Sequence, residues 1–272
     1  MRTTWPHSHA TAPDARPGIV VVNHNTRQLV AQLIYSLYRT LRPPAFGLVV
    51  VDNGSTDGSA ELLSAVATAG LCHLIRNPDN RYHGPGLNQG VSYLAEATQR
   101  AGAVPTSYVW LLDSDCVVLR PDALSAPCTV MDDTGAALVG QRGYDTSDDD
   151  ELLGLHSLLI DPAQVWQPTI PPFQDHGSPS EALQRSCAQA GLLVVDFPYT
   201  RGGYILHIGR GSLREIMATQ DRTNRHYEWA TTHNEPHFAL EADGPAAYAA
   251  FQAAFARDVP TLDVADLIQA CR

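Results

Sequence analysis

Short apolar runs alternate with helix-patterned segments through the first half of the chain. Residues 18–25 form an apolar run that polar residues end, which is typical of a buried parallel strand. Residues 26–41 carry apolar side chains at helical spacing, and two prolines follow them. The same reading predicts strands at 48–51, at 71–75 and in the apolar run that ends at Asp113, and helices at 59–69 and 86–101. This alternation predicts an α/β fold with a Rossmann-like, mostly parallel sheet flanked by helices.

The pattern loosens beyond Pro121. Three further apolar runs, at 154–160, 192–197 and 203–208, predict strands. Residues 179–190 predict a helix that begins after Ser178 and ends at Gly191. From about residue 212 the sequence has a helical bias, which is clearest in the alanine-rich segment 245–256. We therefore expect one elaborated domain with a helical C-terminal segment.

Composition and charge narrow the class of protein. Hydrophobic residues make up 44% of the 272 positions and charged residues 17%, as in ordinary soluble domains. No apolar run approaches the roughly 20 residues that span a bilayer, so we expect no integral membrane segment. The N-terminus lacks the apolar stretch of a signal peptide. A formal net charge of -11 argues against nucleic-acid binding, which needs clustered cations.

All 18 cationic side chains are arginine, because the chain contains no lysine. This excludes Schiff-base chemistry on lysine and the lysine of a phosphate-binding P-loop. Arginine, backbone amides or a metal ion must hold any bound phosphate. The cysteines are odd in number and show no CxxC spacing, which favours reduced thiols in the cytoplasm and no zinc site; they are Cys72, Cys116, Cys128, Cys187 and Cys271.

Polar clusters follow three predicted strands, at residues 23–25, 52–57 and 113–115. Ligands of parallel sheets bind at the carboxyl ends of strands, so these clusters predict one binding crevice. The run VWLLDSDCVVL leads directly into Asp113 and Asp115, which share one side of an extended backbone. Two adjacent carboxylates repel each other, and a divalent cation would relieve that repulsion. The alternative is a polar strand end whose acids cap a turn.

Four motifs occur in order: VVVNHN, VVVDNGSTDGS, NPDNRYHGPGLNQG and WLLDSDCVVLRPDAL. With them the chain resembles the inverting family 2 glycosyltransferases of the GT-A fold. The resemblance implies a nucleotide-sugar-binding half at 18–124 and, more faintly, an acceptor-binding half of the same domain at 125–212. Outside these halves we expect a flexible leader at 1–17 and a C-terminal helical extension at 213–272.

The resemblance also implies which residues bind the donor, a UDP-, dTDP- or GDP-linked sugar. The nucleotide and its phosphates would contact Asn23, Asn25, Asp52, Asn53, Arg81, Asn88, Asp113, Ser114 and Arg210. Asp115 would bind Mn²⁺ or Mg²⁺ directly, with Asp113 and His207 as further metal ligands. The alternatives are that Arg81 is an exposed loop residue and that His207 is structural.

Residues 173–198 resemble the acceptor side of the same family, where an acid serves as the general base. Asp175 is the candidate base. Glu181 is the alternative, because the commoner family pattern places the acid closer to the helix. Three histidines, at 226, 233 and 237, lie in a polar stretch that we interpret as a loop or acceptor-side segment; Pro236 argues against a helical metal pair.

We therefore expect a metal-dependent, inverting glycosyltransferase that is cytoplasmic and acts on a small-molecule or glycan acceptor. The sequence is compatible with a homodimer. One alternative is a phosphatase of the haloacid dehalogenase type with Asp113 as its nucleophile. Such an enzyme normally needs a later lysine, which this chain lacks. The other alternative is a non-catalytic module that binds a nucleotide or a glycan.

Overall fold

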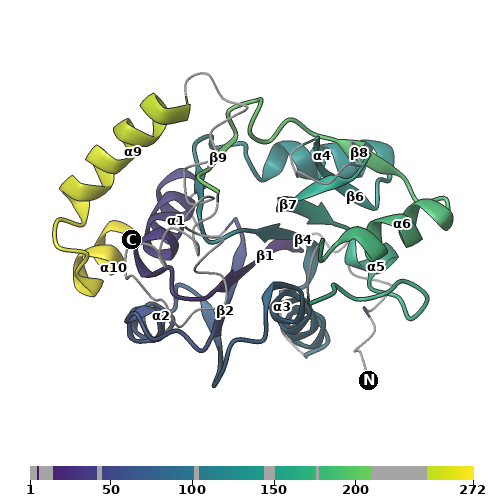
Figure 1. The fold of residues 1–272 in the computed structure, drawn as a ribbon. Helices are drawn as coiled ribbons and strands as arrows, with labels where there is room; N and C mark the ends of the chain where they lie inside the picture. Colours follow the sequence, from purple (N-terminus) through teal and green to yellow (C-terminus); the bar gives the residue numbers. More distant parts are fainter. Residues whose placement is uncertain are drawn as a thin grey trace, which may run out of the picture.

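The computed structural model describes Trp5 and residues 15–41, 45–100, 104–143, 151–175, 178–209 and 244–272. At its centre lies a seven-stranded sheet with the order β3-β2-β1-β4-β7-β6-β8 (Figure 1). Its strands are β1 (Arg16–Asn23), β2 (Gly47–Asn53), β3 (His73–Asn77), β4 (Thr106–Leu112), β6 (Leu138–Arg142), β7 (Leu153–Ile160) and β8 (Val194–Asp196). Only β7 runs against the others in this sheet. A separate two-stranded sheet pairs β5 (Cys116–Val118) with β9 (Ile205–His207).

Helices cover both faces of the large sheet (Figure 1). On one face lie α1 (Arg27–Thr40), α2 (Ser59–Thr68), α4 (Ser125–Thr134), α9 (Gly244–Asp258) and α10 (Val264–Ala270). On the other lie α3 (His83–Thr98), α5 (Pro162–Val165) and α6 (Glu181–Gln189). Ile19 and Val21 pack into the first layer and Val20 into the second. Both faces are covered, which explains the continuous apolar run of β1 and confirms the predicted α/β fold.

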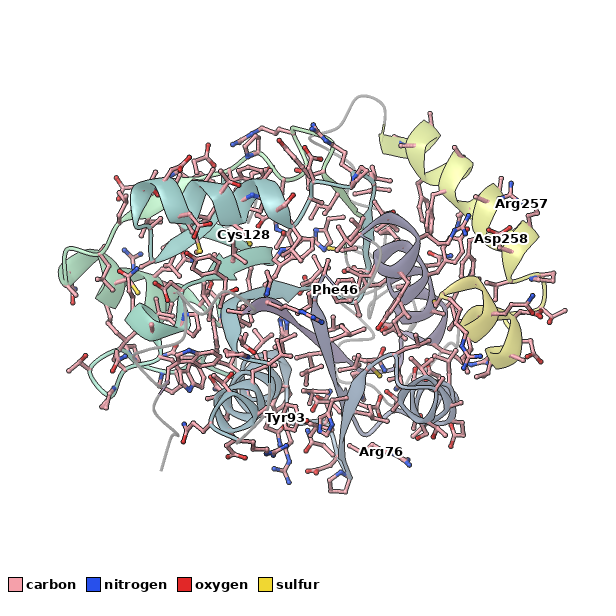
Figure 2. All side chains as sticks on the ribbon, turned by 180° about the vertical axis from the view of Figure 1, so that it is seen from behind. Phe46, Arg76, Tyr93, Cys128, Arg257 and Asp258 are labelled. Atoms are coloured by element: carbon pink, nitrogen blue, oxygen red, sulfur yellow. The ribbon has the colours of Figure 1, made fainter. Side chains whose placement is uncertain are left out.

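The C-terminal helices complete the first layer by packing against α1. Tyr35 of α1 lies edge-on to Phe255 of α9, with ring centroids 5.3 Å apart. Its hydroxyl donates a hydrogen bond of 2.6 Å to Asp258, which lies beside Arg257 at the end of α9 (Figure 2). The helical bias predicted for the end of the chain therefore corresponds to a packed element of the domain.

Helix α3 lies unusually close to β1, because glycines line the facing side of the helix. A Cβ added at Gly86 would lie 2.9 Å from Val22, and one added at Gly90 would lie 2.3 Å from Val20. No larger residue fits at either position without displacing a core valine. The glycines of the HGPGLNQG motif thus bring the start of α3 to the carboxyl edge of the sheet.

Each predicted helix or strand that the structure contains begins and ends within three residues of the predicted bounds. Three elements, α4, β6 and α5, were not predicted. The predicted strand that ends at Asp113 corresponds to β4, which ends one residue earlier at Leu112; the chain then leaves the large sheet and resumes in the small sheet at Cys116. The predicted leader 1–17 differs from the structure in two respects: β1 begins at Arg16, and the side chain of Trp5 is buried among residues of the second layer.

None of the helices within the described ranges combines the length and the apolar character that crossing a bilayer requires.

The burial of Trp5 gives a first prediction. Removing a buried aromatic ring costs about 3–5 kcal/mol, so we expect Trp5→Ala to lower the free energy of unfolding in urea by about that amount. Trp5→Phe retains most of the apolar ring and should lose distinctly less. Equal stability of Trp5→Ala and the parent protein would show that this ring does not contribute to the core.

Candidate active site at the carboxyl edge of the sheet

The two acids that follow β4 lie in a tight turn between the two sheets. The N–H of Asp113 donates a hydrogen bond of 3.0 Å to the carbonyl of His156, on the neighbouring strand β7. The N–H of Cys116 donates to the carbonyl of Asp113 at 3.1 Å, which closes a turn over residues 113–116. Asp113 and Asp115 therefore lie in a turn, and the prediction that they share one side of an extended strand is wrong.

Two imidazoles face these carboxylates. Nε2 of His207, on β9, lies 3.2 Å from Oδ1 of Asp115 and 3.6 Å from Oδ2 of Asp113. Nε2 of His83, the first residue of α3, lies 3.4 Å from Oδ1 of Asp113. The structure thus brings together the three predicted metal ligands and adds His83. Sequence reasoning missed His83, although it stands in the NRYHGPG motif already assigned to the donor side.

This group of atoms fits a hard divalent cation. In octahedral coordination with metal–ligand distances of about 2.0–2.1 Å, adjacent ligand atoms lie about 3 Å apart. The distances from Nε2 of His207 to the two carboxylates are close to this value. The sulfur of Cys116 is also near, within 4.8 Å of ligand atoms of Asp115 and His207. Burial raises the pKa of the Cys116 thiol well above its usual value, and thiolate is a soft ligand. Asp115 and His207, with Asp113 beside them, offer the carboxylate and imidazole ligands that suit Mn²⁺ or Mg²⁺ better than a thiol does.

Asn23, Asp52 and Ser55 form a buried hydrogen-bonded cluster at the ends of β1 and β2, where Asn23 lies opposite Asp52. Nδ2 of Asn23 donates to Oδ1 of Asp52 at 2.8 Å and to Oγ of Ser55 at 3.0 Å. Ser55 donates to Asp52 through its hydroxyl at 2.6 Å and its N–H at 3.2 Å. Asp52 is 1% exposed, so its carboxylate organises this loop. A direct contact between Asp52 and a nucleotide stays a prediction.

Asn25 and Thr26 connect this cluster to the acid turn. The N–H of Asn25 donates to Oγ of Ser55 at 2.9 Å. The hydroxyl of Thr26 donates to Oδ1 of Asn23 at 2.7 Å and lies 3.1 Å from the hydroxyl of Ser114. Three predicted donor-site residues, Asn23, Asn25 and Ser114, therefore belong to one continuous network.

A second network of side-chain amides fixes the entry into α3. Nδ2 of Asn53 donates to the carbonyl of Tyr82 at 2.9 Å, and its Oδ1 accepts from Nδ2 of Asn77 at 2.8 Å. Asn77 and Gln89 exchange two further bonds, of 2.7 and 3.0 Å. Tyr82 has a φ of 66°, which non-glycine residues rarely adopt. The amides hold Tyr82 in this strained conformation, and the following residue, His83, is thereby directed at the acid turn.

The two predicted phosphate-binding arginines differ in what the structure describes of them. Arg81 lies in the loop between β3 and α3 with its side chain 49% exposed and its Nε 3.8 Å from Oδ1 of Asp79. An exposed pair at this separation holds the guanidinium only weakly. Arg210 lies outside the described residues, as do His226, His233 and His237.

The segment at residues 173–175, which was predicted to lie on the acceptor side, is held against the start of α3. The side-chain amide of Asn88 donates to the carbonyl of Phe173 at 2.8 Å and accepts from the N–H of Phe173 at 3.0 Å. A Cβ added at Gly84 would lie 1.7 Å from the carbonyl oxygen of Gln174, so the two backbones are in direct contact. Asn88 therefore anchors this segment, and its predicted contact with a nucleotide stays a prediction. Asp175 follows directly and is exposed.

Glu181, the alternative base, has a different environment from Asp175. It begins α6, and its Oε1 accepts a hydrogen bond of 2.9 Å from Nε of Arg185, one turn along the same helix. Asp175 instead follows the residue that touches Gly84, and Gly84 is the neighbour of His83. Asp175 therefore follows in the chain a residue that packs on the start of α3, whereas Glu181 is held in an ion pair within its own helix.

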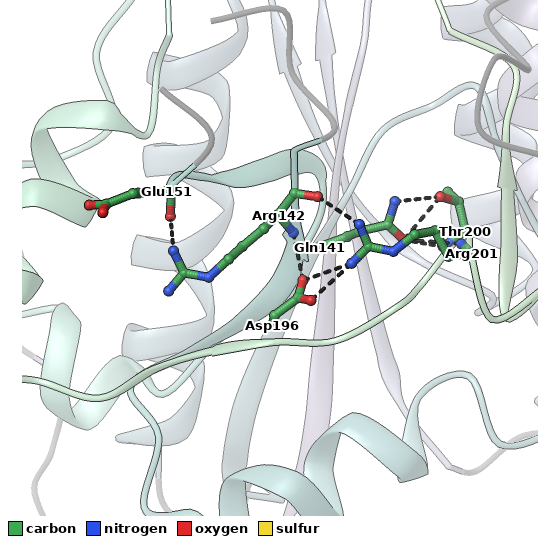
Figure 3. Close-up of polar contacts among 6 residues, drawn as sticks. All are labelled: Gln141, Arg142, Glu151, Asp196, Thr200 and Arg201. Atoms are coloured by element: carbon green, nitrogen blue, oxygen red, sulfur yellow. Dashed lines mark hydrogen bonds and ion pairs between the residues drawn. The ribbon is translucent and has the colours of Figure 1, made fainter. Parts of the chain in front are cut away.

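A further network anchors the chain that leads into β9 (Figure 3). Oε1 of the buried Gln141, on β6, accepts from the N–H groups of Thr200 at 2.8 Å and Arg201 at 3.1 Å. Asp196, on β8, accepts from the N–H of Arg142 at 2.7 Å and from the guanidinium of Arg201 at 2.9 Å. These bonds fix the turn before β9 to the edge of the large sheet, and so fix the position of the histidine that ends β9.

The sequence matches the family model for glycosyl transferase family 2 over residues 18–193. The chain belongs to this family. The match runs from β1 to α6 and includes the whole acid turn and His83, whereas His207 lies beyond its end. Membership favours the glycosyltransferase interpretation over the phosphatase alternative. A comparison with curated proteins finds no match.

Solved structures show the GT-A fold. The mannosyltransferase PcManGT from Pyrobaculum calidifontis, in complex with GDP-Man and Mn²⁺, aligns with a TM-score of 0.54 and 18% identity, covering 96% of this chain and 87% of its own. S. aureus TarS 1-349 in complex with UDP-GlcNAc aligns with a TM-score of 0.52 and 16% identity, and the alignment covers 94% of this chain and 89% of TarS 1-349. Glucosyl-3-phosphoglycerate synthase from Mycobacterium tuberculosis was solved with Mn²⁺, UDP and glucosyl-3-phosphoglycerate. It aligns with a TM-score of 0.51 and 17% identity, and the alignment covers 82% of this chain and 85% of the synthase.

The contact at Gly84 gives a second prediction. We expect Gly84→Ala to push residues 173–175 away from α3, because the added carbon cannot share space with a backbone carbonyl. Overpacking of this kind costs about 1–3 kcal/mol of stability. Amide hydrogen exchange at Phe173 and Gln174 should rise with it. Gly47→Ala is the matched control, since no atom lies within 4 Å of its added Cβ. Identical exchange in the two variants would contradict the contact.

Proposed function

We propose that this protein transfers a sugar from a nucleoside-diphosphate sugar to a hydroxyl of a small-molecule or glycan acceptor, with inversion at the anomeric carbon. The observation that carries the proposal is the convergence of Asp113, Asp115 and His207 at the carboxyl edge of a family 2 domain. The structural neighbours add support, since PcManGT was solved with GDP-Man and Mn²⁺ and TarS with UDP-GlcNAc.

In this proposal Asp113, Asp115 and His207 hold Mn²⁺ or Mg²⁺, which neutralises charge on the leaving diphosphate. The loops around Asn23, Asn25, Asp52 and Asn53 form the base and ribose side of the crevice. Ser114 lies between these loops and the cation site, where its hydroxyl meets that of Thr26. Arg81 and Arg210 supply further positive charge to the phosphates, a role that no lysine can take in this chain.

Asp175 is the proposed general base. Its carboxylate takes the proton of the acceptor hydroxyl while the oxygen attacks the anomeric carbon, and the nucleoside diphosphate leaves with the bonding electrons. A single in-line displacement of this kind inverts the configuration. The position of Asp175 beside the start of α3 supports this assignment over Glu181, whose carboxylate pairs with Arg185.

We also propose a cytoplasmic location. The described cysteines, Cys72, Cys116, Cys128, Cys187 and Cys271, are all free thiols. Free thiols in this number are typical of a reducing compartment.

The cation site gives a third prediction, measured by thermal melting with Mn²⁺ and UDP, dTDP or GDP. We expect one diphosphate to raise the melting temperature of the parent protein only when Mn²⁺ is present. Asp115→Ala should melt at the parent temperature without ligand and show no shift with both ligands. Asp122→Ala is the matched control, because its exposed carboxylate pairs with Arg120 instead. A diphosphate shift that survives EDTA, or that Asp115→Ala retains, would contradict the proposed cation site.

The base assignment gives a fourth prediction. With the donor that this melting panel identifies, Asp175→Asn should bind as the parent does but turn the donor over about 10²–10⁴-fold more slowly, the usual contribution of a general base. Glu181→Gln loses an exposed ion pair and should retain turnover. Turnover by Asp175→Asn at the rate of the parent protein would refute the assignment of Asp175 as the general base. Donor binding by the parent without any turnover, to water or to acceptors, would favour the non-catalytic binding module.

A further inference from the structure

We propose that His156 is a positioning residue of the cation site, and that its ring sets the orientation of the His207 imidazole. This inference rests on the proposed function, because it takes His207 to be a cation ligand. His156 lies on β7, between the acid turn and β9. It belongs to neither the nucleotide crevice nor the acceptor segment.

The backbone of His156 is held in place by the acid turn itself. Its carbonyl accepts the N–H of Asp113 at 3.0 Å and the thiol of Cys116 at 3.5 Å. The adjacent pair in the β4–β7 ladder is Leu112 opposite Ser157, so His156 continues the ladder one step beyond the end of β4. The position of His156 is therefore fixed relative to the same turn that carries both carboxylates.

The ring of His156 is stacked on the ring of His207. Their centroids lie 4.8 Å apart and their planes are inclined by only 15°. His156 is 4% exposed, so the surrounding core restricts its movement. The stack thus brings one face of the His207 ring against a fixed planar surface.

A cation ligand on β9 needs such support. The two strands of the small sheet, β5 and β9, are each three residues long, and their pairing places the backbone of His207 opposite Cys116. Backbone pairing leaves rotation about χ2 of an imidazole broad, so packing must select the angle that points Nε2 at the acids. Residues that orient metal ligands typically contribute about 10–100-fold to metal affinity.

The test compares two buried replacements of similar size, His156→Phe and His156→Leu. Phenylalanine keeps a planar ring against His207, whereas leucine fills the space without one. The full-length variants are titrated with Mn²⁺ in the presence of the diphosphate that gives the largest melting shift, and free Mn²⁺ is measured by electron paramagnetic resonance. Leu158→Ala, on the same strand, controls for a general loss of packing. Melting without ligand verifies that each variant is folded.

We expect His156→Leu to weaken Mn²⁺ binding about 10–100-fold, and His156→Phe and Leu158→Ala to stay within about threefold of the parent. Electron spin echo spectra should show a coordinated imidazole nitrogen in the parent and in His156→Phe but a weaker one in His156→Leu. If the leucine variant does not fold, His156→Met replaces it, because the flexible side chain adapts to the cavity.

Parent-like Mn²⁺ affinity in folded His156→Leu or His156→Met would overturn the inference and leave the proposed function intact. An equal loss in the phenylalanine and leucine variants would also overturn it, because the ring plane would then not be what matters. Failure of the parent itself to bind Mn²⁺ with every diphosphate would instead refute the proposed function.

Discussion

Compensation of the Asp113 and Asp115 carboxylates by two histidines is the constraint around which this edge of the domain is organised. Two carboxylates next to a buried strand cost free energy unless positive charge or hydrogen-bond donors compensate them. The chain meets this cost with His83 and His207, contributed by α3 and β9. These two elements are far apart in sequence, so the compensation exists only when the whole domain is folded.

The position of α3 links this edge of the sheet to the segment around Phe173 and Gln174. Its glycines allow the helix to approach β1, and that approach brings His83 to Asp113 and Gly84 to the backbone of Gln174. Asn88, one turn later, ties the same segment through both amide atoms. One helix therefore contacts Asp113 of the acid turn at its first residue and holds residues 173–174 with the next turn. The packing of α3 against the core therefore also sets the geometry of the site.

The sequence was sufficient for features that depend on local pattern. Strands buried on both faces read as continuous apolar runs, and polar residues such as Asn23 and Asp52 ended them at the correct edge. Features that depend on distant partners were not predictable. The turn after Leu112 forms because β7 presents the carbonyl of His156, and nothing near Asp113 in the sequence indicates that. The burial of Trp5 likewise depends on the second helical layer.

The amide network of Asn53, Asn77 and Gln89 contains no group that gains or loses a proton in the physiological range. Acidification and added salt therefore leave its hydrogen bonds unchanged. The strained backbone at Tyr82, and with it the direction of the following residue, His83, depends on these bonds. The entry into α3 therefore keeps its conformation when the pH or the ionic strength of the surrounding solution changes.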